Sequence, residues 1–300
     1  MIKQLASALA LVACLGVGQT AAAKDMKVVS ERTVPGFGHP ESVGYDPKGR
    51  MLYVGDFGPG ELQPAAKDGK GKISKVSLDG TIVEAAFLPI AGQTLNKPKG
   101  IWISGGRLWV TDIDAVWVFD LATRQGKRLE LPGVEFANDP TVIGNALYIS
   151  DNRTDQLIRV EPADFLRTKT APRIAVVLHG RGINPNGLYP GAGGAILMAG
   201  FKSKDEPRAL FMMSPGKEPE AISDPIGQLD GLYRMADGDV LATDWVTGSL
   251  FQWNAKTGVR KLASDFKGPA DFCVVPNPAG LLVVVPDLVK GELRFVQLAR

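Results

Sequence analysis

The stretch NKPKGIWISGGRLWVTDIDAVWVFD, residues 96–120, decides the fold of this chain. It contains a polar opening, a short β-favouring run, a Gly-Gly turn and a second apolar run that ends at Asp112, and a third run follows. This is the pattern of consecutive antiparallel hairpins. The phrase returns at intervals of roughly 40 to 60 residues, in segments that begin at His39, Phe136, Asn184, Leu229 and Pro269. The sequence therefore predicts an all-β fold, a six-bladed β-propeller with four-stranded antiparallel blades.

A propeller must pair the two ends of its chain, because otherwise its first and last blades keep free strand edges. Residues 27–34 precede the first phrase and alternate loosely between apolar and polar side chains. We expect them to supply an outer strand to the last blade, because the chain ends at Arg300, soon after the final apolar run. No Pro/Gly-rich or charged linker divides residues 24–300, so the sequence predicts a single domain there.

The N-terminal segment has the composition of an export signal. Lys3 precedes an apolar run over residues 5–17, and small residues follow at 21–23. The run is short for a membrane span. The pattern predicts a signal peptide over residues 1–23 and a periplasmic or secreted mature protein. The alternative is a lipoprotein anchor, because residues 11–14 fit a lipobox.

Composition excludes several classes of site and partner. The 34 basic and 32 acidic residues nearly cancel, and no basic stripe is interleaved with aromatics, so we expect no nucleic-acid partner. Two histidines cannot form a three-histidine zinc site, and no CxxC pair exists. No G-x-S-x-G elbow or phosphate-binding loop is present. Cys273 has apolar neighbours, and we expect a buried small hydrophobe there.

Each phrase opens with a polar residue, and a propeller brings equivalent positions to one end of its central channel. The expected equivalent residues are Glu41, Lys99, Asp139, Asn186, Asp230 and Asp271. Carboxylate and amide oxygens are the ligands that a hard cation such as Ca²⁺ prefers. The candidate ligand set, which includes the neighbour of Asp139, is Glu41, Asn138, Asn186 and Asp230.

A second set of acidic residues recurs where the second apolar runs end. Its members are Asp56, Asp112, Asp151, Asp244 and Asp287. Because they recur in most blades, we expect them to cap turns rather than form a site. The tryptophans lie in or beside predicted strands, and we expect them to pack between blades.

The opening motifs resemble those of the senescence-marker-protein/gluconolactonase/LRE-like family. The motifs that carry this resemblance are His39-Pro40-Glu41, Phe136-Ala137-Asn138-Asp139, Asn184-Pro185-Asn186-Gly187-Leu188 and Leu229-Asp230-Gly231-Leu232. The resemblance implies a divalent metal in the channel, Ca²⁺ in our expectation, held by the four candidate ligands. It also implies that Asp230 is catalytic, because its family equivalent is both a ligand and a proton-transfer group.

The chain departs from this family at three positions. Ser42 and Pro140 stand where the family usually has glycine, and Phe136 stands where sugar-lactonase members carry an arginine. Phe136 therefore favours a more apolar or aromatic small-molecule substrate. The candidate substrate-binding residues are Phe136, Asp139 and His39, and His39 could also serve as a channel histidine of the kind paraoxonase-type propellers use.

These observations predict an exported metal-dependent hydrolase that acts on a lactone or ester. The alternative is a non-catalytic NHL-repeat propeller that binds a peptide, a glycan or a small ligand, because residues 96–120 also fit that repeat. A strictosidine-synthase-like propeller is a third interpretation, although its late channel glutamate has no clear counterpart here. Fold alone does not decide among the three.

Overall fold

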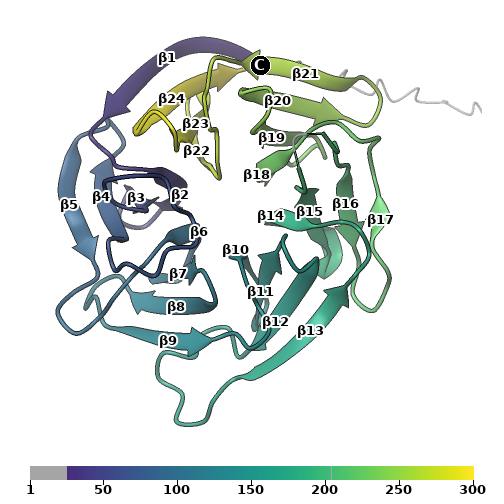
Figure 1. Cartoon of the computed structure of the whole chain (residues 1–300). Helices are drawn as coiled ribbons and strands as arrows, with labels where there is room; N and C mark the ends of the chain where they lie inside the picture. The colour runs from purple at the N-terminus through teal and green to yellow at the C-terminus, as the bar shows by residue number, and fades with distance from the viewer. Residues whose placement is uncertain (1–25, 204) are drawn as a thin grey trace, which may run out of the picture.

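Six four-stranded antiparallel sheets surround a central axis in the computed structural model, which describes residues 26–203 and 205–300 (Figure 1). The predicted six-bladed all-β propeller is confirmed. The predicted signal peptide and lipobox lie outside the described residues. Within the described part of the chain, no helix is both long enough and apolar enough to cross a membrane.

The strands follow one another from the inside of each blade to its outside. Blade one contains β2 (Pro40–Asp46), β3 (Met51–Asp56), β4 (Lys72–Ser77) and β5 (Ile82–Leu88). Blade two contains β6 (Pro98–Ser104), β7 (Arg107–Asp112), β8 (Ala115–Asp120) and β9 (Gly126–Glu130). Blade three contains β10 (Ala137–Ile143), β11 (Ala146–Asp151), β12 (Gln156–Glu161) and β13 (Arg173–His179).

The second half of the chain repeats this arrangement. Blade four contains β14 (Pro185–Pro190), the 3-10 turn η1 (Ala192–Gly194), β15 (Ile196–Gly200), β16 (Leu210–Met213) and β17 (Glu220–Ala221). Blade five contains β18 (Leu229–Arg234), β19 (Val240–Asp244), β20 (Ser249–Asn254) and β21 (Gly258–Ala263). Blade six contains β22 (Cys273–Asn277), β23 (Gly280–Asp287) and β24 (Glu292–Ala299), with β1 (Lys27–Pro35) outside them.

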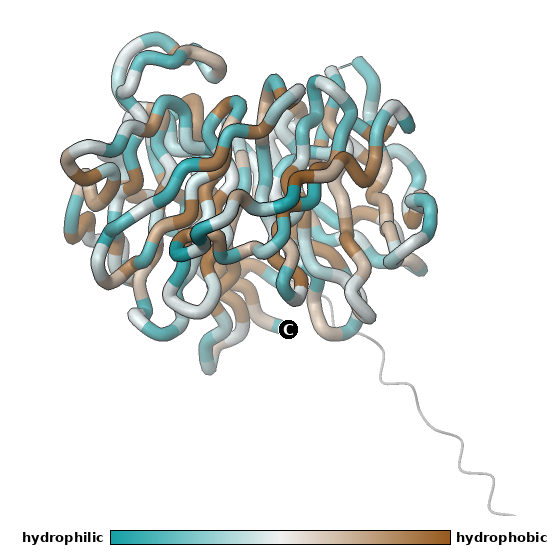
Figure 2. The backbone as a smooth tube through the Cα atoms, turned by 90° about the horizontal axis from the view of Figure 1, so that it is seen from below, coloured by the Kyte–Doolittle hydropathy of each residue, from teal (hydrophilic) through white to brown (hydrophobic). Residues whose placement is uncertain are grey.

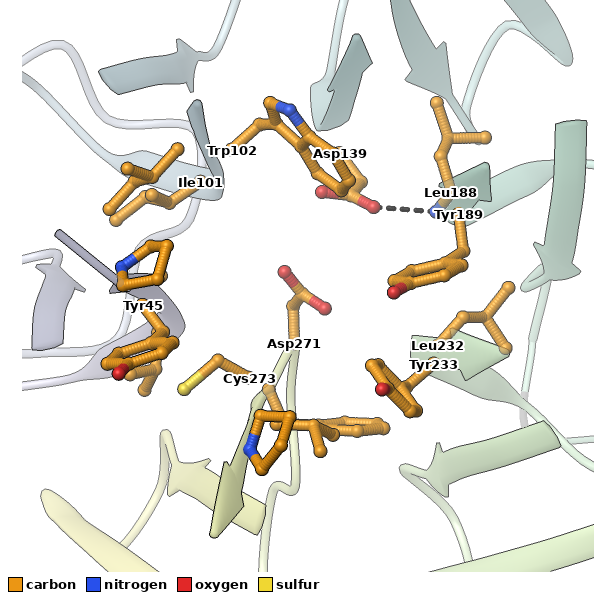
Figure 3. Close-up of a pocket in the computed structure, with 17 residues that line it drawn as sticks. Tyr45, Ile101, Trp102, Asp139, Leu188, Tyr189, Leu232, Tyr233, Asp271 and Cys273 are labelled. Atoms are coloured by element: carbon orange, nitrogen blue, oxygen red, sulfur yellow. Dashed lines mark hydrogen bonds between the residues drawn. The ribbon is translucent and has the colours of Figure 1, made fainter. Parts of the chain in front are cut away.

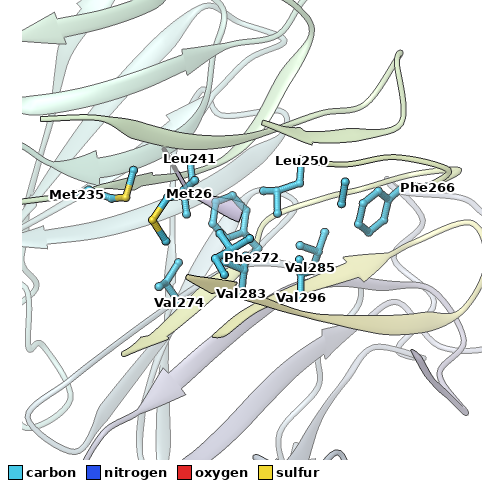
Figure 4. Close-up of a cluster of buried hydrophobic side chains, with 12 residues drawn as sticks. Met26, Met235, Leu241, Leu250, Phe266, Phe272, Val274, Val283, Val285 and Val296 are labelled. Carbon is cyan, nitrogen blue, oxygen red and sulfur yellow. The ribbon is translucent and has the colours of Figure 1, made fainter. Parts of the chain in front are cut away.

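The two ends of the chain close the ring. β1 pairs antiparallel with β24, so residues 27–34 complete the last blade as the sequence predicts. Met26, just before β1, is buried in a cluster with Met235 and Leu241 of blade five and Phe272 at the start of blade six (Figure 4). The first strand therefore joins the two final blades by both hydrogen bonds and apolar burial.

The core lies between neighbouring blades. One cluster packs Tyr53 and Ile73 of blade one against Leu108 and Trp117 of blade two. Hydrophobic stretches run along many of the strands, and many turns at the rims are hydrophilic (Figure 2). Each blade buries both of its faces, so a strand can carry apolar side chains on both faces of its sheet.

The aspartates that end the second strands are structural. The Asp56 carboxylate accepts hydrogen bonds from the backbone amides of Gly38, His39 and Gly58 at 2.8–2.9 Å. The same position in four other blades binds backbone amides in the same way, through Asp112, Asp151, Asp244 and Asp287. The predicted capping role is confirmed for Asp56, Asp151, Asp244 and Asp287, which tie the turn to the loop that leads into the inner strand, whereas Asp112 binds amides of that loop.

Candidate functional site in the central channel

The register at the start of each inner strand identifies the equivalent channel positions. Pro40 pairs with Asp56, Pro98 with Asp112, and a bulge follows each pair. The corresponding residues of the other blades are Ala137, Pro185, Leu229 and Pro269. The residues that come next form what we call the opening ring, namely Glu41, Lys99, Asn138, Asn186, Asp230 and Ala270.

Two of the expected equivalences are wrong by one residue. Asp139 and Asp271 follow the opening ring rather than belong to it, because Asn138 and Ala270 hold the equivalent positions. Successive residues of a strand point to opposite sides, so an offset of one residue changes where a side chain goes. The ligand set chosen from the sequence includes Asn138, and all four of its members belong to the opening ring.

A cavity of about 220 Å³ lies at this end of the channel, and we call it the first mouth. Glu41, Asn138, Asn186 and Asp230 all line it. The remaining lining is mostly apolar, and it includes Phe57, Leu62, Pro64, Phe136, Phe201 and Trp245. A few polar groups in a largely apolar lining are the usual composition of a small-molecule site. We call the aromatic part of this lining, Phe57, Phe136, Phe201 and Trp245, the aromatic rim.

The two amides of the polar group are fixed by hydrogen bonds. Asn138 Nδ2 donates to Asn186 Oδ1, and Asn186 Nδ2 donates to the carbonyl oxygen of Leu229 at 3.0 Å. The side chain of Asn186 also contacts the Asp230 carboxylate. These contacts hold three of the four predicted ligands together across blades three, four and five.

Both carboxylates of the group are buried and hold their protons more tightly than usual. Burial raises the pKa of Asp230 to about 7, and the contact with Asn186 opposes this rise. Burial also raises the pKa of Glu41, the Asp230 carboxylate raises it further, and Lys99 opposes the rise. Within the described residues, Glu41 Oε2 is buried without a hydrogen-bond partner. Such an atom costs free energy unless a ligand pairs with it.

Lys99 is a fully buried cation beside these carboxylates. Its Nζ lies 4.1 Å from the ring centroid of Phe136, and no hydrogen-bond partner for this Nζ occurs in the part of the chain that the structure describes. Burial lowers the pKa of Lys99 to about 8, and the Glu41 carboxylate opposes this. The Arg153 Cζ atom lies 3.9 Å from the centroid of the same ring, so the Phe136 ring contacts two cationic side chains.

Hydroxyl groups join the opening ring to the neighbouring blades. Ser150 Oγ donates to the carbonyl oxygen of Asn186, and Thr111 and Thr243 make the same bond to Asn138 and Ala270. Each hydroxyl residue directly precedes a capping aspartate. These bonds were not predicted, although the repeated Thr-Asp, Ser-Asp and Thr-Asp pairs are their signal in the sequence.

The aromatic rim was also missed, and it has a sequence signal as well. Phe57, Phe201 and Trp245 each directly follow the last residue of a second strand, so one position of the repeat builds much of the rim. Trp109, Trp117 and Trp253 are buried as expected. Trp245 and Trp102 are not confined to packing between blades, because they line opposite ends of the channel.

The three predicted substrate contacts lie in three different places. Phe136 lines the first mouth. His39 does not line it; its Nδ1 lies 3.0 Å from the Leu288 carbonyl oxygen and its Nε2 2.9 Å from that of Gly60. Asp139 lines the opposite end of the channel, where its Oδ2 accepts the backbone amide of Leu188 at 2.6 Å. The structure therefore brings only Phe136 into the cavity with the four predicted ligands.

Fold and site together define a six-bladed propeller with a polar channel. No protein-family model matches the sequence, and no curated protein sequence matches it. Among solved structures, a catalytically inactive variant of virginiamycin B lyase from Staphylococcus aureus, determined with quinupristin, has 14% identity and a TM-score of 0.58 over 91% of this chain and 99% of the other. A protein of unknown function from Bacteroides thetaiotaomicron has 13% identity and a TM-score of 0.60 over 91% and 76%. The nidogen/laminin complex contains a similar chain, with 17% identity and a TM-score of 0.54 over 75% and 78%. Similarities at such low identity establish the fold alone.

Proposed function

We propose that this protein is a metal-dependent hydrolase of the gluconolactonase type that opens a lactone or ester at the first mouth. The observation that carries the proposal is the unpartnered Glu41 Oε2, which is buried in a cavity shared with Asp230 and two amides. A protein seldom leaves a buried carboxylate oxygen without a partner. A cation bound between Glu41 and Asp230 would supply one, and it would offset both the burial and the repulsion by Asp230 that raise the pKa of Glu41.

The donor set fits a hard divalent cation such as Ca²⁺. The ligand atoms that Glu41, Asp230, Asn138 and Asn186 offer to a cation are oxygens, and water can complete the six to eight ligands that Ca²⁺ takes. Asn186 Oδ1 already accepts a hydrogen bond from Asn138, so the two carboxylates and Asn138 Oδ1 are the freest donors. When bound, such a cation polarises a carbonyl oxygen and makes a water molecule more acidic.

The residues of the chain supply the rest of the chemistry. Asp230 accepts a proton from the attacking water, because its carboxylate lines the cavity that would hold the substrate. Phe201 and Trp245 bind the apolar part of the substrate at the rim and exclude water. Phe136 occupies the position of the sugar-contacting arginine, so we propose an apolar or aromatic lactone or ester as the substrate. Export to the periplasm or beyond remains part of the proposal.

Metal analysis of the purified protein followed by Ca²⁺ calorimetry tests the site, and a lactone and aryl-ester panel with and without chelator tests the reaction. We expect Glu41→Gln to weaken Ca²⁺ binding, and Asp230→Asn to weaken it and to lower kcat/KM by about 100-fold or more. Asp224→Asn, an exposed carboxylate in the loop after β17, is the matched control and should change neither. The proposal is wrong if the activity persists both in the presence of chelator and in the Asp230→Asn variant.

A binding-only propeller is the second candidate, and Lys99 is the observation that favours it. Its buried ammonium lies in the opening ring and opposes the rise in the pKa of Glu41, so the chain carries part of the countercharge itself. The structural neighbours include both an enzyme, the lyase, and a component of the nidogen/laminin complex. Absence of Ca²⁺ binding by both the unaltered protein and Lys99→Met would place this candidate first.

A further inference from the structure

The channel has a second cavity at its other end, where the inner strands finish. It has a volume of about 350 Å³, and we call it the second mouth. Aromatic side chains of four blades stand around it, namely Tyr45, Trp102, Tyr189 and Tyr233 (Figure 3). Two carboxylates, Asp139 and Asp271, point into its centre from blades three and six.

The walls form an ordered aromatic arc. The rings of Trp102 and Tyr189 lie 6.2 Å apart at 70°, and those of Tyr189 and Tyr233 lie 5.2 Å apart at 62°. Trp102, Tyr189 and Tyr233 lie three residues after Lys99, Asn186 and Asp230 of the opening ring, so one position of the repeat builds the arc. Fixed rings of this kind present electron-rich faces and edges to a cavity at little entropic cost.

The two carboxylates at the centre of the second mouth, Asp139 and Asp271, lack cationic partners. Asp139 is 4% exposed and Asp271 is 8% exposed, and neither forms an ion pair with any described residue. Burial and the Asp271 carboxylate raise the pKa of Asp139, and burial and the Asp230 carboxylate raise that of Asp271. None of the 17 residues that line the second mouth is basic. The cavity therefore offers two carboxyl groups and aromatic surface but no basic residue, and a bound cation would favour the ionised form of the carboxyls.

This chemistry excludes anions and disfavours a bare metal ion. An anion would meet two carboxylates without a basic residue to offset them. A Ca²⁺ ion needs six to eight oxygen ligands, whereas the lining around Asp139 and Asp271 is dominated by apolar and aromatic side chains. A positively charged organic group matches both features, because it pairs with a carboxylate and is attracted to ring faces.

We propose that the second mouth is a binding site for an organic cation, with its ammonium group above Asp271 and its carbon atoms against Trp102, Tyr189 and Tyr233. The site is separate from the first mouth, because the two cavities share no lining residue. It does not depend on the proposed hydrolase activity.

Calorimetry and tryptophan fluorescence with tetramethylammonium, choline and cadaverine test the proposal. The neutral isostere of choline, 3,3-dimethylbutan-1-ol, is the matched probe, since it keeps the shape and lacks the charge. We expect at least one of the three cations to bind saturably, and the isostere to bind about tenfold more weakly or not at all. Asp271→Asn should weaken binding of the cation by about tenfold or more, whereas Phe201→Leu, at the rim of the first mouth, should leave it within about twofold.

Tyr233→Leu provides a second variant that keeps both carboxylates. It should weaken cation binding about threefold to tenfold, because it removes one aromatic face. The proposal is overturned if none of the three cations binds saturably, if choline and its isostere bind equally, or if folded Asp271→Asn binds choline like the unaltered protein.

Discussion

Asp230→Asn should stabilise the metal-free protein even though Asp230 is the proposed catalytic base. Burial raises the pKa of Asp230 from 3.8 to about 7, so the folded protein keeps a proton at pH values where the unfolded chain has lost it. The free energy of unfolding therefore falls as the pH rises from about 4 to about 7. The neutral amide of asparagine does not titrate and avoids this loss.

The size of the effect follows from the two pKa values. At about 1.4 kcal/mol for each pH unit between them, keeping Asp230 ionised in the fold at pH 8 costs about 4 kcal/mol. The variant keeps part of this free-energy cost, because the amide of asparagine is also costly to bury. We expect a gain of about 1 to 4 kcal/mol at pH 8, which is about 2 to 8 °C in Tm for a chain of this size, and almost none at pH 3.

The assay is thermal unfolding from pH 3 to pH 8 in chelator and again in excess Ca²⁺. In chelator, the difference in Tm between Asp230→Asn and the unaltered protein should grow with pH, while Asp224→Asn should show no such trend. In Ca²⁺ the difference should shrink or reverse, because the ion stabilises the protein that binds it more tightly. A variant that melts below the unaltered protein in chelator at pH 8 would refute the reasoning about the buried charge. An equal rise in Tm with Ca²⁺ for both proteins would refute the cation site.

Three further predictions concern other features of the fold and the channel. Lys99→Met should tighten Ca²⁺ binding about fivefold or more, measured by calorimetry, because it removes a buried positive charge beside Glu41. An unchanged affinity would show that Lys99 does not act on the bound ion. Ser150→Ala should lower the free energy of unfolding by about 1 to 3 kcal/mol in denaturant titrations, because it removes the bond from blade three to the Asn186 carbonyl; Ser264→Ala, in the loop after β21, is the control. A chain that begins after Pro35 should melt at least about 10 °C lower or unfold without cooperativity, because β24 loses its outer partner strand, β1. An unchanged Tm would contradict the role of β1 in closure.

Local sequence determined the architecture because the repeat carries its own pairing rules. Turn residues and β-favouring runs recur in each phrase, so residues 96–120 predict the blade that β6, β7 and β8 form. The closing strand was predictable because residues 27–34 had no other partner in the repeat. The capping role of Asp56 was predictable because carboxylates at turns bind nearby backbone amides. Repeat equivalence also placed Glu41, Asn186 and Asp230 at one end of the channel, but in blade three it chose Asp139 in place of Asn138.

Only the tertiary structure decided which way the channel side chains point and how deeply they are buried. Successive residues of an inner strand point to opposite sides, so Asn138 lines the first mouth and Asp139 the second. The burial of Lys99 depends on Phe136 and on carboxylates from other blades, and no spacing within one phrase encodes those contacts. The sequence by itself therefore determined the blades, the closure and the polar opening positions. The two mouths arise only when six blades close around one axis, because desolvation, charge coupling and cavity shape depend on residues distant in the chain.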